Sequence, residues 1–366
     1  MVSSACELTS CTVVTPDDDL LGYAGYLDLT IDKERAAFGR TFAGNLVGLR
    51  DAPLQTPGAQ VRWRTDAEAV AVVLEYQGRV HPHQCSEACA ITNTGQCYTS
   101  GCRARCAALL FVDGVLQDGA TRHTDGEYSG EVRVVAMQQA ERRSHDYELV
   151  MPWAAALEFR RLELGSRLGL PQLLPCAPPP TFLYVAYGDS IVQGWCGDQP
   201  YPELIARRNG WRSLNLGFAG MGATPEADWG HGAAIGRAGG ALVSIAIGTN
   251  DFWWCGLVAE PVRSTIVGLR RRQPLVPIVV MTPTTAWYDG KECEGGGARQ
   301  TLQRIREDVA QAVSRWTNPM ASRIPWHPGS HTIPVRAQPG RPEGPHPLQI
   351  LPSRSFPPDP SLQILP

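Results

Sequence analysis

Three short segments of the chain place a serine hydroxyl, glycine and asparagine directly after apolar runs. Ser190 lies in the segment Tyr-Gly-Asp-Ser-Ile-Val-Gln-Gly, Gly220 ends Asn-Leu-Gly-Phe-Ala-Gly, and Asn250 lies in Gly-Thr-Asn-Asp. A serine hydroxyl can attack a carbonyl carbon, and fixed N–H donors stabilise the oxyanion that then forms. The three segments therefore contain the residue types that acyl transfer through a serine requires.

Four apolar runs, each ending at a turn, alternate with helix-like stretches after residue 181. This alternation predicts βαβ units and a parallel sheet covered on both faces. The carboxyl ends of parallel strands lie at one edge of a sheet, where ligands bind. We therefore expect Ser190, Gly220 and Asn250 to meet in one crevice. The expected strands are residues 182–188, 211–217, 241–248 and 277–283, and the clearest helices are residues 261–273 and 298–316.

Taken alone, Gly-Asp-Ser is typical of any strand-to-helix turn with a serine cap. With the other two segments, residues 181–316 resemble the SGNH (GDSL-like) hydrolase superfamily, whose first three blocks are G-D-S, N-x-G-x-x-G and G-x-N-D. The resemblance implies a three-layer, flavodoxin-like α/β fold and Ser190 as the nucleophile. It also implies an oxyanion hole made by the backbone amides of Ser190 and Gly220 and the side chain of Asn250. Asp189 would organise the loop, and no metal or organic cofactor is required.

Two other α/β sites fit the sequence less well. An α/β-hydrolase would need a G-x-S-x-G elbow, which the chain lacks. The glycines at 217–222 differ in spacing from the G-x-G-x-x-G of a dinucleotide-binding loop.

The acid–base half of the superfamily site is hard to find. A serine needs a base, which the superfamily supplies in a D-x-x-H block after the last strand. His327 is followed by proline, as in the superfamily, but Ile324 occupies the acid's position. Asp228 and His231 have the right spacing but follow the wrong strand. Our leading explanation is that the native C-terminus has been replaced after Trp316, so that the base is absent and one edge of the sheet is left exposed.

The first half of the chain has a different pattern. From about residue 38 to 165, short runs alternate apolar and polar residues, which predicts a β-sandwich. This part resembles the jelly-roll-like N-terminal domain of carbohydrate esterase family two. The expected organisation is an N-terminal segment of undefined structure at 1–37, the sandwich at 38–173, a proline-rich linker at 174–180, a truncated hydrolase-type domain at 181–316 and a tail at 317–366.

The tail is rich in proline, with 13 of the 30 prolines after residue 318. It contains Leu-Gln-Ile-Leu-Pro twice, at 348–352 and 362–366. This composition is typical of disordered, low-complexity sequence, and we expect no strand or helix there.

Composition and charge limit the possible partners. Hydrophobic residues make up 43% of the 366 residues and charged residues 19%, as in globular proteins, and the net charge is −3. No basic stripe suggests nucleic acid as a partner, and no apolar run reaches the roughly 18 residues of a membrane span. The N-terminus is a poor signal peptide. The oligomeric state cannot be read from the sequence.

Eleven cysteines favour disulfides and an oxidising, secretory compartment, which conflicts with the poor signal peptide. Five of them lie between residues 85 and 106 near His81 and His83, but their spacings do not match zinc knuckles, so a disulfide-stapled loop is the preferred interpretation. Cys196 and Cys255 could form a bridge above the crevice.

The functional hypothesis is hydrolysis of a small acyl ester, such as an acetyl group on a carbohydrate, through a Ser190 acyl-enzyme. The first alternative is an inactive carbohydrate-binding protein that lacks the Asp-x-x-His pair. The second is an acyltransferase on the same scaffold. Three aromatic side chains after the blocks could stack on a sugar, line an acyl pocket or simply pack under loops: Trp195, Trp253 and Trp254.

Overall fold

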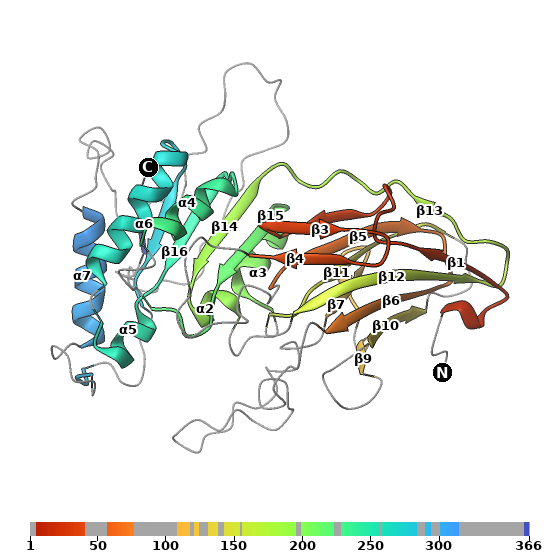
Figure 1. The fold of residues 1–366 in the computed structure, drawn as a ribbon, viewed down its shortest axis with the longest axis horizontal. Coiled ribbons are helices and arrows are strands. Elements are labelled where there is room, and N and C mark those ends of the chain that lie inside the picture. Colours follow the sequence, from red (N-terminus) through yellow and green to blue (C-terminus); the bar gives the residue numbers. More distant parts are fainter. Residues whose placement is uncertain are drawn as a thin grey trace, which may run out of the picture.

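The structure is a computed structural model with two parts side by side along its long axis (Figure 1). The strand-rich N-terminal part lies on the right of the view and the α/β part on the left. Among the described helices, none is long and apolar enough to span a bilayer. The described residues are 5–40, 57–76, 108–117, 121–123, 131–137, 143–153, 156–194, 199–222, 228–256, 258–283, 290–293, 301–314 and 362–365.

Two antiparallel sheets form the N-terminal part, which confirms the expected sandwich. The first sheet has the order β3 (Asp28–Ile31), β4 (Ala36–Gly39), β12 (Leu157–Ser166), β6 (Ala69–Tyr76), β10 (Glu131–Met137) and β9 (Thr121–His123), with β1 (Ser10–Val14) also beside β12. The second has the order β13 (Leu173–Leu174), β5 (Gln60–Thr65), β11 (His145–Val150), β7 (Leu109–Val112) and β8 (Val115–Leu116), with β2 (Gly22–Ala24) also beside β5.

Alternation along the strands builds the sandwich core. In β5, Val61, Trp63 and Thr65 are buried, and the residues that alternate with them are half-buried. The Trp63 ring stacks on Tyr147 of the neighbouring strand with centroids 5.3 Å apart. Strand β6 is apolar almost throughout because it is covered on both faces. Val70 and its alternate neighbours face the main core, whereas Ala69 and Ala71 pack near the short helix η1 (Ala5–Glu7).

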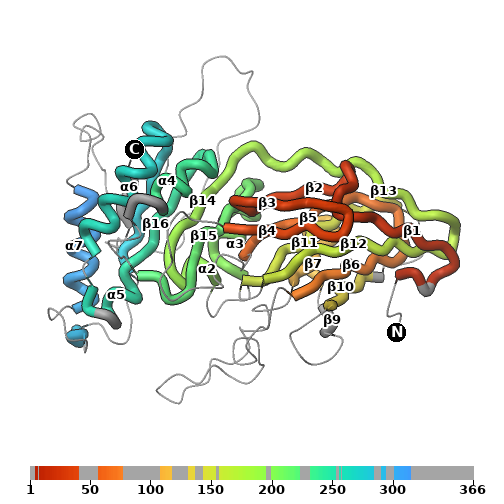
Figure 2. The backbone as a smooth tube through the Cα atoms, viewed as in Figure 1, coloured from red at the N-terminus to blue at the C-terminus, as the bar shows by residue number. Residues whose placement is uncertain are grey.

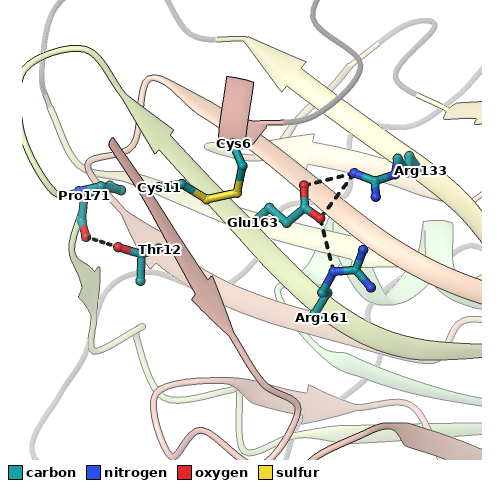
Figure 3. The surroundings of a disulfide bond; sticks show 7 residues. All are labelled: Cys6, Cys11, Thr12, Arg133, Arg161, Glu163 and Pro171. Carbon is teal, nitrogen blue, oxygen red and sulfur yellow. Dashed lines mark hydrogen bonds and ion pairs between the residues drawn. A yellow bond between two sulfur atoms is a disulfide. The ribbon is translucent and has the colours of Figure 1, made fainter. Parts of the chain in front are cut away.

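The sandwich begins before the boundary expected at residue 38, which falls inside β4. Ser10–Val14 pairs antiparallel with β12, and β2 pairs with β5. These N-terminal strands have three to five residues, too few for a clear alternating pattern. A disulfide between Cys6 and Cys11 ties η1 to β1, beside the ion pairs that Glu163 of β12 forms with two arginines (Figure 3).

The α/β part contains the four expected strands. They are β14 (Leu183–Gly188), β15 (Arg212–Gly217), β16 (Leu242–Ala246) and β17 (Ile278–Met281), all parallel, in the spatial order β15-β14-β16-β17. In order along the chain this is 2-1-3-4, the flavodoxin-like arrangement. The expected fold class is therefore confirmed.

Helices cover both faces of this sheet (Figure 2). Tyr184 and Ala186 pack with Val192 on the face that carries α2 and α3. Val185 and Tyr187 point to the opposite face, into the cluster formed with α4, α6 and α7. The helices are α2 (Ser190–Gln193), α3 (Tyr201–Asn209), α4 (Asp228–Arg237), α5 (Thr249–Trp254), α6 (Ala259–Arg272) and α7 (Leu302–Ser314).

The outer edge of β17 is paired rather than exposed. Strand β18 (Leu362–Leu365), part of the second Leu-Gln-Ile-Leu-Pro repeat, lies antiparallel beside it. The expectation of no strand in the tail is wrong for these four residues. Leu, Ile and Leu suit a strand whatever the composition around them. Residues 315–361 lie outside the described part of the chain.

Cys255, which ends α5, forms a disulfide with Cys293. The bridge expected between Cys196 and Cys255 is therefore wrong. Cys293 lies 38 residues further along the chain, and no local spacing marks it as the partner. Cys196 and the cysteines between residues 85 and 106 lie outside the described residues.

Replacing Cys293 tests this bridge. The loop that it closes spans 38 residues, so Cys293→Ser should lower the free energy of unfolding of the α/β part by up to about 4 kcal/mol. Urea unfolding followed by tryptophan fluorescence measures the change. Cys176→Ala is the matched control, because Cys176 is a free cysteine. Equal midpoints for the two variants would contradict the pairing.

Candidate active site

Ser190 is the first residue of α2, directly beyond the carboxyl end of β14. Gly188 makes this turn possible, because a side chain there would overlap the carbonyl oxygen of Ala246 on the neighbouring strand. Asp189 caps the helix, and its carboxylate accepts a hydrogen bond from the Ile191 backbone N–H at 2.9 Å. The Ser190 residue itself is half-buried. The local sequence thus presents the serine at the strand end, as expected.

Asp189 connects the first segment to the third. Its side chain is 3% exposed and hydrogen-bonds the Thr249 side chain. Burial raises the pKa of Asp189 to about 6, and the nearby Asp251 carboxylate adds to this rise, while the hydrogen bonds from Ile191 and Thr249 oppose it. The carboxylate is therefore mostly ionised at neutral pH, where it accepts hydrogen bonds from both segments.

The second segment packs directly against α2. A side chain at Gly217 would overlap the backbone of Gln193 and Val192, so this strand end has room only for glycine. The next amide, that of Phe218, donates to the Gly188 carbonyl at 2.8 Å. Gly220 follows with φ +76°, a left-handed conformation that glycine adopts without strain.

Asn250 lies in the first turn of α5 and contacts the second segment. Its side-chain amide donates to the carbonyl of Met221, the residue after Gly220, at 2.8 Å. The three predicted segments therefore meet at the carboxyl edge of the sheet: Asp189 contacts Thr249, and Asn250 contacts Met221.

Gln193, which the sequence did not single out, joins three parts of the site. Its fully buried side chain donates to the Trp153 carbonyl of the sandwich at 2.6 Å and accepts from the Ala219 backbone N–H. One signal was present in the sequence: Gln193 is three residues after Ser190, so a helix places both on neighbouring positions of one face. Nothing in the sequence near Gln193 indicated its contact with the Trp153 carbonyl.

Arg40 is a second residue that the sequence did not reveal. It follows β4 of the sandwich, is 1% exposed, and donates to the carbonyl oxygens of Asn215 and Gly217 at 3.3 and 2.5 Å. Its guanidinium also lies over the Phe218 ring, 4.3 Å from the centroid. Burial lowers the pKa of Arg40 to about 9, so it remains a cation at neutral pH. The sandwich thus holds the strand that leads to Gly220.

The carboxyl group of Glu203 on α3 interacts electrostatically with Arg40. Burial raises the pKa of Glu203 to about 8, while hydrogen bonding from Asn215 and the charges of Arg40 and Arg207 limit the rise. The Asn215 side chain also donates to the Val192 carbonyl at 2.8 Å and accepts from the Gly217 N–H at 2.9 Å. One buried asparagine therefore connects α2, α3 and the end of β15.

His231, the second candidate base, lies buried on the α4 face of the sheet with 2% exposure. Its Nδ1 is hydrogen-bonded to the Tyr187 hydroxyl, and that hydroxyl also contacts the sulfur of Met221 at 3.6 Å. Burial lowers the pKa of His231 to about 4, so the ring is neutral at pH 7. His327 and Trp195 lie outside the described residues, as do the side chains of Asp228, Trp253 and Trp254.

The buried carboxyl of Glu203 should make stability pH-dependent. A folded-state pKa of about 8, above the unfolded value of 4.5, means that the folded state keeps a proton that the unfolded state loses. Stability from this group is therefore full below pH 4.5 and falls as the pH rises to about 8. Glu203→Gln should gain stability relative to the wild type over that range, measured as the thermal midpoint at each pH.

The control for this experiment is Glu260→Gln on the exposed surface of α6. Its midpoint should run parallel to that of the wild type. A constant difference between Glu203→Gln and wild type from pH 5 to 8 would contradict the buried, protonated carboxyl.

Residues 186–329 match the sequence profile of the GDSL-like Lipase/Acylhydrolase family. No match was found among curated proteins.

Solved structures share the fold at low sequence identity. A salicylyl-acyltransferase from a tetracycline biosynthetic pathway is 20% identical, with a TM-score of 0.60 over 84% of this chain and 82% of that chain. A family two carbohydrate esterase from Cellvibrio japonicus is 13% identical, with a TM-score of 0.53 over 84% and 85%. An acetyl xylan esterase from the rumen bacterium Butyrivibrio proteoclasticus is 10% identical, with a TM-score of 0.52 over 84% and 86%.

Proposed function

We propose, on the premise that residues 186–329 belong to the GDSL-like lipase/acylhydrolase family of SGNH hydrolases, that the chain hydrolyses a small acyl ester through a Ser190 acyl-enzyme. Membership of this family implies chemistry of the esterase or acyl-transfer type. One observation supports a Ser190 acyl-enzyme in particular. The hydrogen bond from Asn250 to Met221 brings the third block beside Gly220, at the strand edge where Ser190 begins α2.

In this proposal three N–H donors stabilise the oxyanion: the backbone amides of Ser190 and Gly220 and the side-chain amide of Asn250. An asparagine side chain has two N–H groups, and Met221 takes one of them, so the other remains for the substrate. The contact with Met221 also fixes the orientation of the amide. Donors that are fixed before the reaction stabilise developing charge without reorganisation during the step.

We assign the general base to His327. The family match extends past Trp316 to residue 329 and so includes Trp-His-Pro at 326–328, which supports His327 over a base lost with the C-terminus. His231 is a weaker candidate because its Nδ1 is already bound to Tyr187. His327 would accept the Ser190 proton as the hydroxyl attacks and return it to the leaving alcohol. Water would then release the acid from the acyl-enzyme.

The substrate that we propose is an acetyl or similarly small ester on a carbohydrate. The shared fold with a family two carbohydrate esterase and an acetyl xylan esterase supports this choice. The sandwich supports it as well, because it is integrated with the site through Gln193 and Arg40 instead of being a detached module. Neither metal nor organic cofactor takes part in the proposed steps.

Hydrolysis of p-nitrophenyl acetate tests the assignment. Ser190→Ala should lose all turnover above background, and His327→Gln should lower kcat by about 10³- to 10⁴-fold, because the oxyanion donors remain. Combining the two changes should cost no more than Ser190→Ala alone, since they act as a unit. His231→Gln is the matched control and should retain most of the wild-type kcat.

Three outcomes would change the proposal. A wild-type rate in His327→Gln would exclude that histidine as the base. Turnover that survives Ser190→Ala would exclude the serine. An inactive wild-type chain that still binds an oligosaccharide would favour the non-catalytic carbohydrate-binding alternative.

Acyl transfer to an alcohol is the second candidate, favoured by the similar fold of the salicylyl-acyltransferase with its TM-score of 0.60. Hydrolase and transferase differ in whether water or an alcohol reaches the acyl-enzyme. For the hydrolase we expect released acetate to equal released p-nitrophenol even with a sugar acceptor present. A deficit of acetate matched by acetylated sugar, measured by mass spectrometry, would favour the transferase.

A further inference from the structure

A polar cavity of about 160 Å³ lies between the two parts of the chain. Its residues on β15, Arg212 and Ser213, are at the start of that strand, whereas the candidate active site is at its end. Five residue steps of about 3.3 Å separate Arg212 from Gly217, so the two sites are on the order of 16 Å apart. The cavity is lined by Gln60, Arg62, Glu148, Pro180, Glu203, Ala206, Arg207, Gly210, Trp211, Arg212 and Ser213.

The wall of the cavity on the sandwich side follows from strand alternation. Strand β5 buries Val61 in the core, so Gln60 and Arg62 point to the opposite face of the sheet. Glu148 of β11 is the cross-strand partner of Arg62 and lies on the same face. The opposite wall is made by one side of α3, from Glu203 to Gly210, and by the start of β15.

Positive charge exceeds negative charge in this cavity. Of its two carboxyl groups, Glu148 is already bound by Arg207 at 2.6 Å. Glu203 is mostly protonated at neutral pH because burial raises its pKa to about 8. Within the described part of the chain, Arg62 and Arg212 form no ion pair, so two guanidinium groups remain for a ligand.

Several buried polar atoms of the lining residues lack hydrogen-bond partners among the described residues. They are the Nε of Arg207, the Nε of Arg212, the Oγ of Ser213, a residue that is 2% exposed, and the Oε1 of Glu203. Buried donors are almost always satisfied, and those left over in one cavity point to a ligand that accepts hydrogen bonds. The first three atoms are donors or can donate, and the Glu203 carboxyl can donate when it is protonated.

We propose that this cavity binds a small oxyanion, with Arg62 and Arg212 as the cationic groups and the Ser213 hydroxyl as an additional donor. Planar guanidinium groups suit carboxylate and phosphate oxygens, to which they can donate two parallel hydrogen bonds. The volume admits an inorganic anion or a small carboxylate. Trp211 in the lining adds an apolar surface, so a sugar acid is the larger ligand that fits this chemistry. The site is separate from the serine and does not depend on the proposed function.

Isothermal titration of the full chain tests the site with glucuronate, acetate and inorganic phosphate. Glucose and sodium chloride at matched ionic strength are the controls. We expect saturable binding of at least one oxyanion and none of glucose. Stronger binding of glucuronate than of acetate would identify a sugar acid, and stronger binding of phosphate would identify a phosphoryl group.

Variants separate this cavity from other anion sites. Arg62→Gln and Arg212→Gln should each weaken binding by about tenfold or more, the scale of a lost charge-assisted contact. Arg208→Gln, which changes a neighbouring arginine outside the cavity lining, is the matched control, and Ser190→Ala should bind the anion as the wild type does. Circular dichroism verifies that each variant folds, and Arg62→Gln alone suffices if Arg212→Gln does not fold.

Two results would overturn the proposal. One is the absence of saturable binding by all three oxyanions. The other is wild-type affinity in folded Arg62→Gln. Binding that disappears in Ser190→Ala would place the anion in the active site and would also exclude this cavity.

Discussion

The arrangement of the two parts depends on the hydrogen bonds that the buried guanidinium of Arg40 donates across their boundary. Arg40 comes from the sandwich and donates to two carbonyl oxygens at the end of β15, where the loop to Gly220 begins. A buried cation is tolerated only when it is paired and hydrogen-bonded. Here the two carbonyl oxygens accept hydrogen bonds from the guanidinium, and the Phe218 ring lies against it. The sandwich is thus part of the framework that holds the site.

Close backbone packing at the strand ends is the second constraint. Glycine at positions 188 and 217 lets α2 and the two strand ends approach closer than any side chain would allow. Gln193 and Asn215 then satisfy the backbone groups that this packing buries. These contacts are buried, and a small displacement would leave polar groups unpaired. Such a framework suits a site whose donors must be in place before the reaction.

The two ends of β15 serve different purposes. Its carboxyl end belongs to the crevice with Ser190, where three loops converge. Its amino end, with Arg212 and Ser213, lines the cavity against the sandwich. One strand therefore links the proposed catalytic site to the proposed anion site, and the buried side chain of Asn215 lies between them. The same docking of the sandwich onto α3 and β15 creates the cavity and holds the loop of the crevice.

The four strands of the α/β part, their parallel direction and the residues at their carboxyl ends could be predicted from the sequence, because the spacing of apolar residues and the positions of turn residues are local properties. The sequence therefore predicted that Ser190, Gly220 and Asn250 lie at one edge of the sheet. Three features became visible only in the folded structure: residues 10–39 belong to the sandwich, Cys255 pairs with Cys293, and Arg40 reaches β15. Contacts such as Arg40 with Gly217 join residues more than 170 positions apart. No local pattern encodes them, since they arise when separate elements pack.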